Sequence, residues 1–192
     1  MEPNVLSPRA VLLIALEAMG GDVHGRTLLQ KRMYFVGELL GEDLGFRSHF
    51  YGPYSSLIHS EAVQASTLGL LLETSSTGPC IPCESRRVDY VLSDSGRDTA
   101  KRAEAMQTSE AEDIRKAVNR LMEACGSLDG ASLSIAAKVH YILTRSSDGP
   151  MTPEEIRQKA KMLRWDVPEE KVIAGVDSLL ALNLVKLVKT EH

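Results

Sequence analysis

Residues 25–72 read GRTLLQKRMYFVGELLGEDLGFRSHFYGPYSSLIHSEAVQASTLGLLL, and this stretch fixes the order of the secondary structure around it. Apolar residues recur at helical spacing over 26–40, and Gly41 ends that pattern. Residues 46–51 alternate enough to predict a short strand, and the Gly52-Pro53 pair that follows predicts a tight turn. The stretch therefore begins as helix, strand and turn.

A second helix and a β-hairpin complete this pattern. Ser55 is a suitable N-cap for a helix over 56–68, and Gly69 lets the backbone leave the helix for a strand over 70–74. A polar loop over 75–87 and a return strand over 88–92 follow. The order of helix, connection, helix and hairpin is typical of a winged-helix domain, in which the hairpin forms the wing.

Helices flank this segment on both sides. Ser7-Pro8 predicts the start of a first helix that includes the apolar run 11–19. After the hairpin, 97–125 is helical with a break near 108–109. Its apolar stripe indicates either packing against the rest of the chain or homodimerisation, and it comprises Ile114, Val118, Leu121 and Cys125.

The C-terminal part predicts a small module that resembles a helix-turn-helix. We expect helices over 132–145, 153–164 and 168–182, then a strand over 184–189. Thr152 begins a capping box, and Asn183 tolerates a left-handed turn. The predicted fold is mainly α with a small β-hairpin. It divides into a winged-helix domain over 1–103, a connecting helix over 104–126 and a helical module over 127–192.

Composition narrows the class of protein. The chain has 192 residues, a formal net charge of −4, 43% hydrophobic residues and three cysteines. It contains no apolar run long enough to span a membrane, and its first residues lack the pattern of a signal peptide. Sparse cysteine is typical of a reducing compartment. We therefore expect a cytoplasmic protein with no membrane contact.

The helix over 56–68 is the predicted contact element of a winged helix. It carries no lysine or arginine, although phosphate charge supplies much of the affinity of DNA binding. Cations from outside it would have to contact the phosphates, whereas a protein partner would use the neutral face of this helix and the turn over 51–55. The candidate contacts with double-stranded DNA or a protein partner are Arg26, Lys31, Arg47, Tyr51, Tyr54, Ser55, Ser56, His59, Ser60, Gln64, Arg86 and Arg87.

Two further hypotheses concern charged or polar residues on apolar faces. Arg32 and Glu61 are each the one charge on an otherwise apolar helix face, which predicts an ion pair between the two helices. His140 lies on a helix beside Ala136 and Ala137, which favours a hydrogen-bonded histidine at the edge of the core over a metal ligand.

The sequence offers little catalytic chemistry. Cys80-Ile-Pro-Cys83 supplies only two thiolates where a structural zinc site needs four ligands, so we favour a plain loop over a metal site shared between chains or a redox pair. Common phosphate-binding and metalloprotease motifs are absent from the sequence, and the histidines are scattered. We predict a protein that is not an enzyme and needs no cofactor.

The residues Leu29-Gln30-Lys31, Tyr34, 51–55 (YGPYS) and 68–70 (LGL) carry a family resemblance. The chain resembles the YwgA-like family of uncharacterised prokaryotic proteins and, more distantly, the Panacea domain of SocA-type antitoxins. The similarity continues weakly through VDYVLSDSG at 88–96, and the chain departs from the pattern at Arg32 and in the CxxC loop. The resemblance implies a winged-helix-like fold without known catalytic residues.

These observations lead to two functional expectations. The first is a non-enzymatic, dimeric, DNA-binding transcriptional regulator. The second is a protein-interaction module of the antitoxin or proteolytic-adaptor type, which the Panacea resemblance implies. A basic surface around the helix over 56–68 would favour DNA, and a neutral or apolar one would favour protein.

Overall fold

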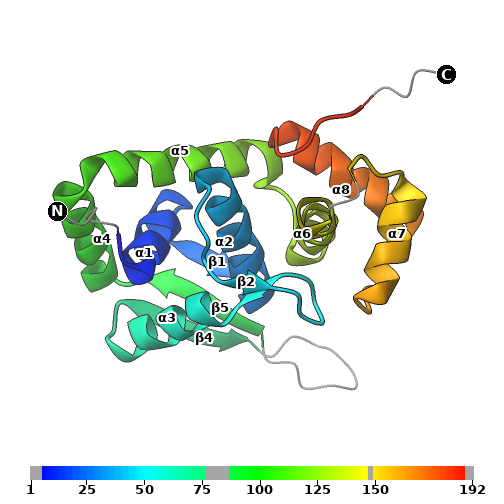
Figure 1. Ribbon diagram of the computed structural model, residues 1–192. Helices are drawn as coiled ribbons and strands as arrows, with labels where there is room; N and C mark the ends of the chain where they lie inside the picture. The colour runs from blue at the N-terminus through cyan, green and yellow to red at the C-terminus, as the bar shows by residue number, and fades with distance from the viewer. Residues whose placement is uncertain (1–5, 77–86, 147–148, 189–192) are drawn as a thin grey trace.

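The computed structural model describes residues 6–76, 87–146 and 149–188 (Figure 1). This part of the chain is mainly helical with a small antiparallel sheet, which confirms the predicted class at that level. Its N-terminal half contains α1 (Pro8–Ala18), β1 (Asp22–His24), α2 (Arg26–Leu40), β2 (Phe46–Arg47), β3 (Tyr54–Ser55), α3 (Ser56–Thr67), β4 (Leu71–Ser76) and β5 (Arg87–Leu92).

The main sheet has the strand order β1-β5-β4, and both pairings are antiparallel. Leu72 pairs with Val91 in the predicted hairpin, and Val23 of β1 pairs with Tyr90. Strand β1 was not predicted, because three residues are too few to show an alternating pattern. This strand fixes the start of α2 beside the hairpin.

The strand predicted over 46–51 is shorter in the structure. Only Phe46 and Arg47 pair with β3. The next main-chain groups bond instead to side chains of α6 and of the segment between α7 and α8. The Ser48 amide donates to the Tyr141 hydroxyl, and the His49 carbonyl accepts from the Trp165 indole. Residues 48–52 therefore form a loop.

Five helices follow the sheet: α4 (Asp94–Met106), α5 (Thr108–Cys125), α6 (Gly130–Arg145), α7 (Pro153–Met162) and α8 (Glu169–Ala181). The predicted break near 108–109 is confirmed at Gln107, whose backbone is not helical, with φ −140° and ψ 69°. The predicted capping box at Thr152 is present. The predicted strand over 184–189 is wrong for its described residues 184–188, since the Leu184 amide bonds back to Leu179 after the left-handed Asn183.

Helix α5 lies across one side of the molecule and packs against α1 and α2 (Figure 1). Its apolar stripe is buried in the core, so packing is the correct alternative and the stripe offers no surface for dimerisation. Helix α6 packs against α2 on one side and against α7 and α8 on the other. A connected hydrophobic core thus joins the N-terminal elements to the C-terminal helices.

Candidate functional site

Helix α2 binds the turn that precedes α3. The Gln30 side chain accepts from the Ser55 amide at 2.9 Å and donates to the Ser55 carbonyl at 3.1 Å. The next residue, Lys31, donates from Nζ to the Pro53 carbonyl at 2.5 Å. Both α2 side chains are buried. We call these contacts between Gln30, Lys31 and residues 53–55 the clamp.

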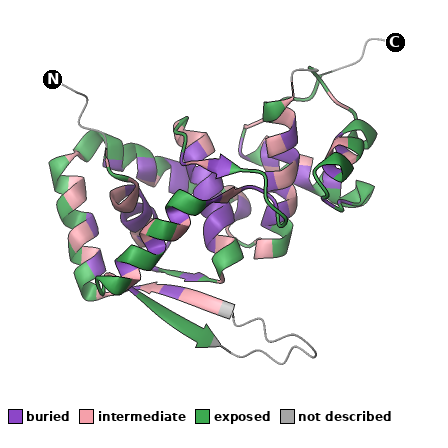
Figure 2. Cartoon of the chain, turned by 60° about the horizontal axis from the view of Figure 1, so that its bottom comes forward, coloured by how far each residue is buried: buried purple, intermediate pink, exposed green. Residues whose placement is uncertain are grey.

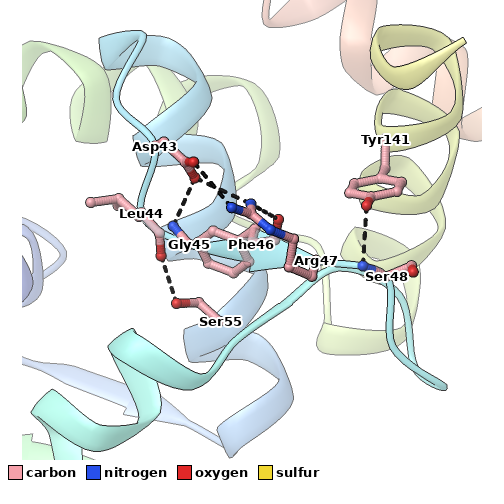
Figure 3. Close-up of polar contacts among 8 residues, drawn as sticks. All are labelled: Asp43, Leu44, Gly45, Phe46, Arg47, Ser48, Ser55 and Tyr141. Carbon is pink, nitrogen blue, oxygen red and sulfur yellow. Dashed lines mark hydrogen bonds and ion pairs between the residues drawn. The ribbon is translucent and has the colours of Figure 1, made fainter.

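The Ser55 hydroxyl adds two hydrogen bonds to the clamp. It donates to the Leu44 carbonyl at 2.6 Å, as Figure 3 shows, and accepts from the Ile58 amide at 3.1 Å as the N-cap of α3. Nearby, the Asp43 carboxylate accepts from the Gly45 amide and pairs with Arg47 at 3.3 Å. Ser55 is fully buried, so its predicted role as a contact residue gives way to a structural one.

The loop over 48–52 reaches from the clamp to the C-terminal helices. Ser48 bonds to the Tyr141 hydroxyl at 3.2 Å (Figure 3), and the His49 carbonyl accepts from Trp165 Nε1 at 2.7 Å. At the tip, the Phe50 and Tyr51 rings meet edge to face at 4.9 Å, and both are exposed. The loop is therefore anchored at its start and presents two aromatic rings to solvent.

A pocket of about 670 Å³ lies between this loop, the start of α2, Val88 of β5 and Gly130 of α6. It brings together four predicted contact residues, namely Arg26, Lys31, Tyr51 and Tyr54. His24 and His49 also line it, although the histidines are scattered along the sequence. The close spacing of His49 and Tyr51 in the sequence could have indicated that these two residues share a site. No local pattern in the sequence indicated the pairing of β1 with β5, which brings His24 to the pocket.

The pocket shifts the pKa values of its two cations, Lys31 and Arg26, in opposite directions. Burial, together with the neighbouring Lys138, lowers the pKa of Lys31 to about 8. The interaction with the Tyr90 hydroxyl raises the pKa of the exposed Arg26. Lys31 therefore carries a charge that its surroundings stabilise poorly, while Arg26 stays fully charged.

The outward face of α3 is a second candidate site. Ser56, Ser60 and Gln64 are exposed as predicted, and the half-buried His59 ring lies 6.1 Å from the Tyr54 ring. Exposed residues cover much of α3 in Figure 2. We call the face formed by Ser56, Ser60, Val63, Gln64 and Thr67 the α3 face.

The predicted ion pair between Arg32 and Glu61 is wrong. Glu61 binds Arg9 of α1 at 2.8 Å, and Arg9 also donates to Gln64 at 2.5 Å. Arg32 instead lies near the Gly126 carbonyl, at 3.4 Å. The error arose because α1 packs against α3 and presents an arginine that the apolar pattern of α3 could not reveal.

The expected cationic footprint is smaller than the sequence suggested. Lys31 is only 2% exposed and cannot reach a DNA backbone, and Arg47 pairs with Asp43. Arg86 lies outside the described residues, as does the side chain of Arg87 at the start of β5. Among the predicted cations whose side chains the structure describes, Arg26 is exposed and interacts with the Tyr90 hydroxyl rather than with a carboxylate in an ion pair.

His140 is a buried, hydrogen-bonded histidine, as predicted. Its Nδ1 lies 2.8 Å from the Tyr34 hydroxyl and 4.0 Å from a Glu38 carboxylate oxygen. Burial and the nearby Arg145 lower the pKa of His140 to about 4. It connects α6 to α2 within the buried core.

Comparison with known proteins adds no relative: no protein-family model matches the chain, and no curated protein matches it. Within the described ranges, no helix is long and apolar enough to cross a membrane, and no group of His, Cys, Asp and Glu could hold a metal ion. Cys80 and Cys83 lie outside those ranges.

Proposed function

We propose that this chain is a non-enzymatic winged-helix protein whose α3 face binds a protein partner. The order α1-β1-α2-α3-β4-β5 with the sheet order β1-β5-β4 supports the winged-helix interpretation, because β4 and β5 form a hairpin beside the helix that follows the central α2. Helix α3 would be the contact helix of such a domain.

The lack of positive charge on α3 favours a protein partner over DNA. The helix has no lysine or arginine, and the arginine that α1 brings to it is neutralised by Glu61. Apolar side chains are exposed instead, since Val63 is 45% and Leu68 is 58% accessible. A DNA-binding face needs positive charge for the phosphates, whereas a neutral, partly apolar face suits a protein.

DNA binding remains the second candidate, and the hairpin favours it. Arg26 is exposed beside β5, and Arg87 begins that strand. Winged helices use such wing cations for phosphate contacts. In this alternative the wing would supply the affinity and α3 would contribute neutral hydrogen bonds.

The test places a photo-activated cross-linking residue at Val63 in the native host, with the same residue at Ile173 of α8 as a matched control. Both positions are about half exposed, at 45% and 50%. We expect a single protein adduct from Val63 that is absent from Ile173 and is lost in a Ser60→Glu variant. Adducts of equal yield from both positions would contradict the proposal.

Fluorescence anisotropy with random duplex DNA tests the second candidate. We expect no binding at low salt. Micromolar binding that weakens steeply with salt, and weakens further in Arg26→Gln/Arg87→Gln, would replace the protein partner with DNA.

A further inference from the structure

We propose that the pocket between α2, the 48–52 loop and β5 binds a small aromatic anion. The pocket measures about 670 Å³, within the range of small-molecule sites, and its described lining contains no aspartate or glutamate. Neither a family nor a curated relative assigns a ligand to it. It lies apart from the α3 face, so the proposal stands independently of the protein partner.

The buried Lys31 ammonium is the main argument for an anion. Its one hydrogen bond within the described chain goes to the Pro53 carbonyl, and no described carboxylate forms an ion pair with it. An ammonium offers three donors, and a buried charge is stabilised by a counter-charge. An anion in the pocket would satisfy the remaining donors and the charge together.

A second lysine increases the excess of positive charge. Gly52 adopts a φ of +99°, and a Cβ built there would meet Lys138 Cγ at 3.1 Å and Lys31 Nζ at 3.5 Å. Both lysine side chains therefore converge on Gly52, and the charge of Lys138 adds to burial in lowering the pKa of Lys31. The turn requires a glycine here, which keeps the backbone close to the two cations.

Two features extend this positive region to the mouth of the pocket. The Arg26 guanidinium is exposed there. Gly25 is the N-cap of the 15-residue helix α2 and provides no side-chain acceptor for its first amides. Free amides at a helix N-terminus favour negative charge, so they would add to the attraction of Lys31 and Arg26.

The ring system on the loop side indicates the rest of the ligand. The His49 and Tyr54 rings lie 5.1 Å apart with an interplanar angle of 34°, and both line the pocket together with Tyr51. Such rings provide flat apolar surface on which a planar group can stack. A ligand with one aromatic ring and one anionic group would use both halves of the pocket.

Isothermal titration calorimetry at neutral pH and low salt tests the proposal with matched pairs of probes. AMP is compared with adenosine and inorganic phosphate, and 4-hydroxybenzoate is compared with 4-hydroxybenzamide. We expect at least one of the two aromatic anions to bind at least tenfold more tightly than its uncharged counterpart and than phosphate. Binding of phosphate with equal affinity would mean an unspecific anion site and would overturn the proposal, as would no binding of either aromatic anion.

Variants place the binding in this pocket. Arg26→Gln changes an exposed side chain and is expected to weaken the anion about fivefold, while Arg47→Gln, an exposed arginine outside the pocket, leaves it unchanged. Lys31→Met should reduce binding more, and circular dichroism establishes whether it folds. If it does not fold, Lys138→Gln replaces it, with an expected weakening of about threefold. Equal affinity of Arg26→Gln and the unaltered protein would overturn the assignment.

Discussion

The clamp and the α3 face lie next to each other along the chain, yet they use polar residues in opposite ways. In the clamp, Gln30, Lys31 and Ser55 are buried and bonded to main-chain groups of neighbouring segments. On the α3 face, Ser56 and Ser60 point to solvent. Polar residues of similar type thus stabilise the fold in the clamp and are exposed to solvent a few residues later.

This difference changes the meaning of the sequence motif. The residues from which the sequence predicted a family resemblance, LQK and YGPYS, are largely those of the clamp. Their hydrogen bonds explain why these residue types are needed at this spacing. Within the described residues the turn pairs with no strand other than β2, so side chains of α2 must form hydrogen bonds with its main-chain groups. The motif therefore supports the fold, whereas the proposed protein partner would contact side chains outside the clamp.

The largest expected effect is that of Gln30→Leu. The change keeps the approximate volume but removes two buried hydrogen bonds and leaves the Ser55 amide without its acceptor. We expect a loss of about 3 kcal/mol in the free energy of unfolding. Urea denaturation measures it, with Gln64→Leu on the α3 face as control at below about 0.5 kcal/mol. Similar losses in both variants would remove the distinction between the two regions.

Acid should weaken the contact that joins the clamp helix to α6. The pKa of His140 falls from 6.5 to about 4 in the folded protein, so the unfolded chain binds this proton more tightly. The contribution of neutral His140 to the free energy of unfolding is therefore fully present above pH 6.5. It decreases by about 2 to 3 kcal/mol as the pH falls toward 4. Denaturation midpoints across this range measure the loss.

His140→Gln is the control for that titration, because it removes the group and should flatten the acid slope between pH 6.5 and 4. The comparison with the variant matters because burial raises the pKa of the neighbouring Glu38, which acts in the opposite direction. The difference between the two curves isolates His140. Parallel curves would show that another group causes the acid loss.

Ser55→Ala should have a smaller effect than the loss of Gln30. The variant loses the N-cap bond to the Ile58 amide and the bond to the Leu44 carbonyl, both buried. We expect about 2 kcal/mol of destabilisation by urea denaturation. Ser56→Ala, one residue later on the α3 face, should change stability by less than about 0.5 kcal/mol. A neutral Ser55→Ala would mean that water replaces both bonds.

The sequence predicted local features of the fold but not its long-range contacts. Local patterns located most helices, the caps at Ser7, Ser55 and Thr152 and the hairpin, because capping and periodicity depend on near neighbours in the chain. Long-range contacts were not visible. The sequence placed Lys31 among surface cations, and only the packing of the Gly52-Pro53 turn onto α2 buries it.

The candidate sites show the same limit. The polar composition of the α3 face was predicted correctly, since helical periodicity alone assigns its exposed side. The pocket was not predicted as a unit, because His24 reaches it through the pairing of β1 with β5 and Gly130 through the packing of α6 on α2. Such contacts depend on tertiary structure that one sequence does not encode in any local pattern.

The smallest expected effect concerns Arg9, the cation that neutralises α3. Its pair with Glu61 is partly exposed, so Arg9→Gln should lower stability by no more than about 0.5 kcal/mol. Its effect on binding should be larger, because the variant leaves Glu61 uncompensated beside Gln64 and makes the α3 face negative. If the partner is a protein that accepts a neutral face, the yield of the Val63 adduct should fall several-fold while the urea midpoint stays constant. An unchanged yield with an unchanged midpoint would show that the partner does not contact the Arg9 side of α3, and would restrict the binding face to the side of Ser56 and Ser60.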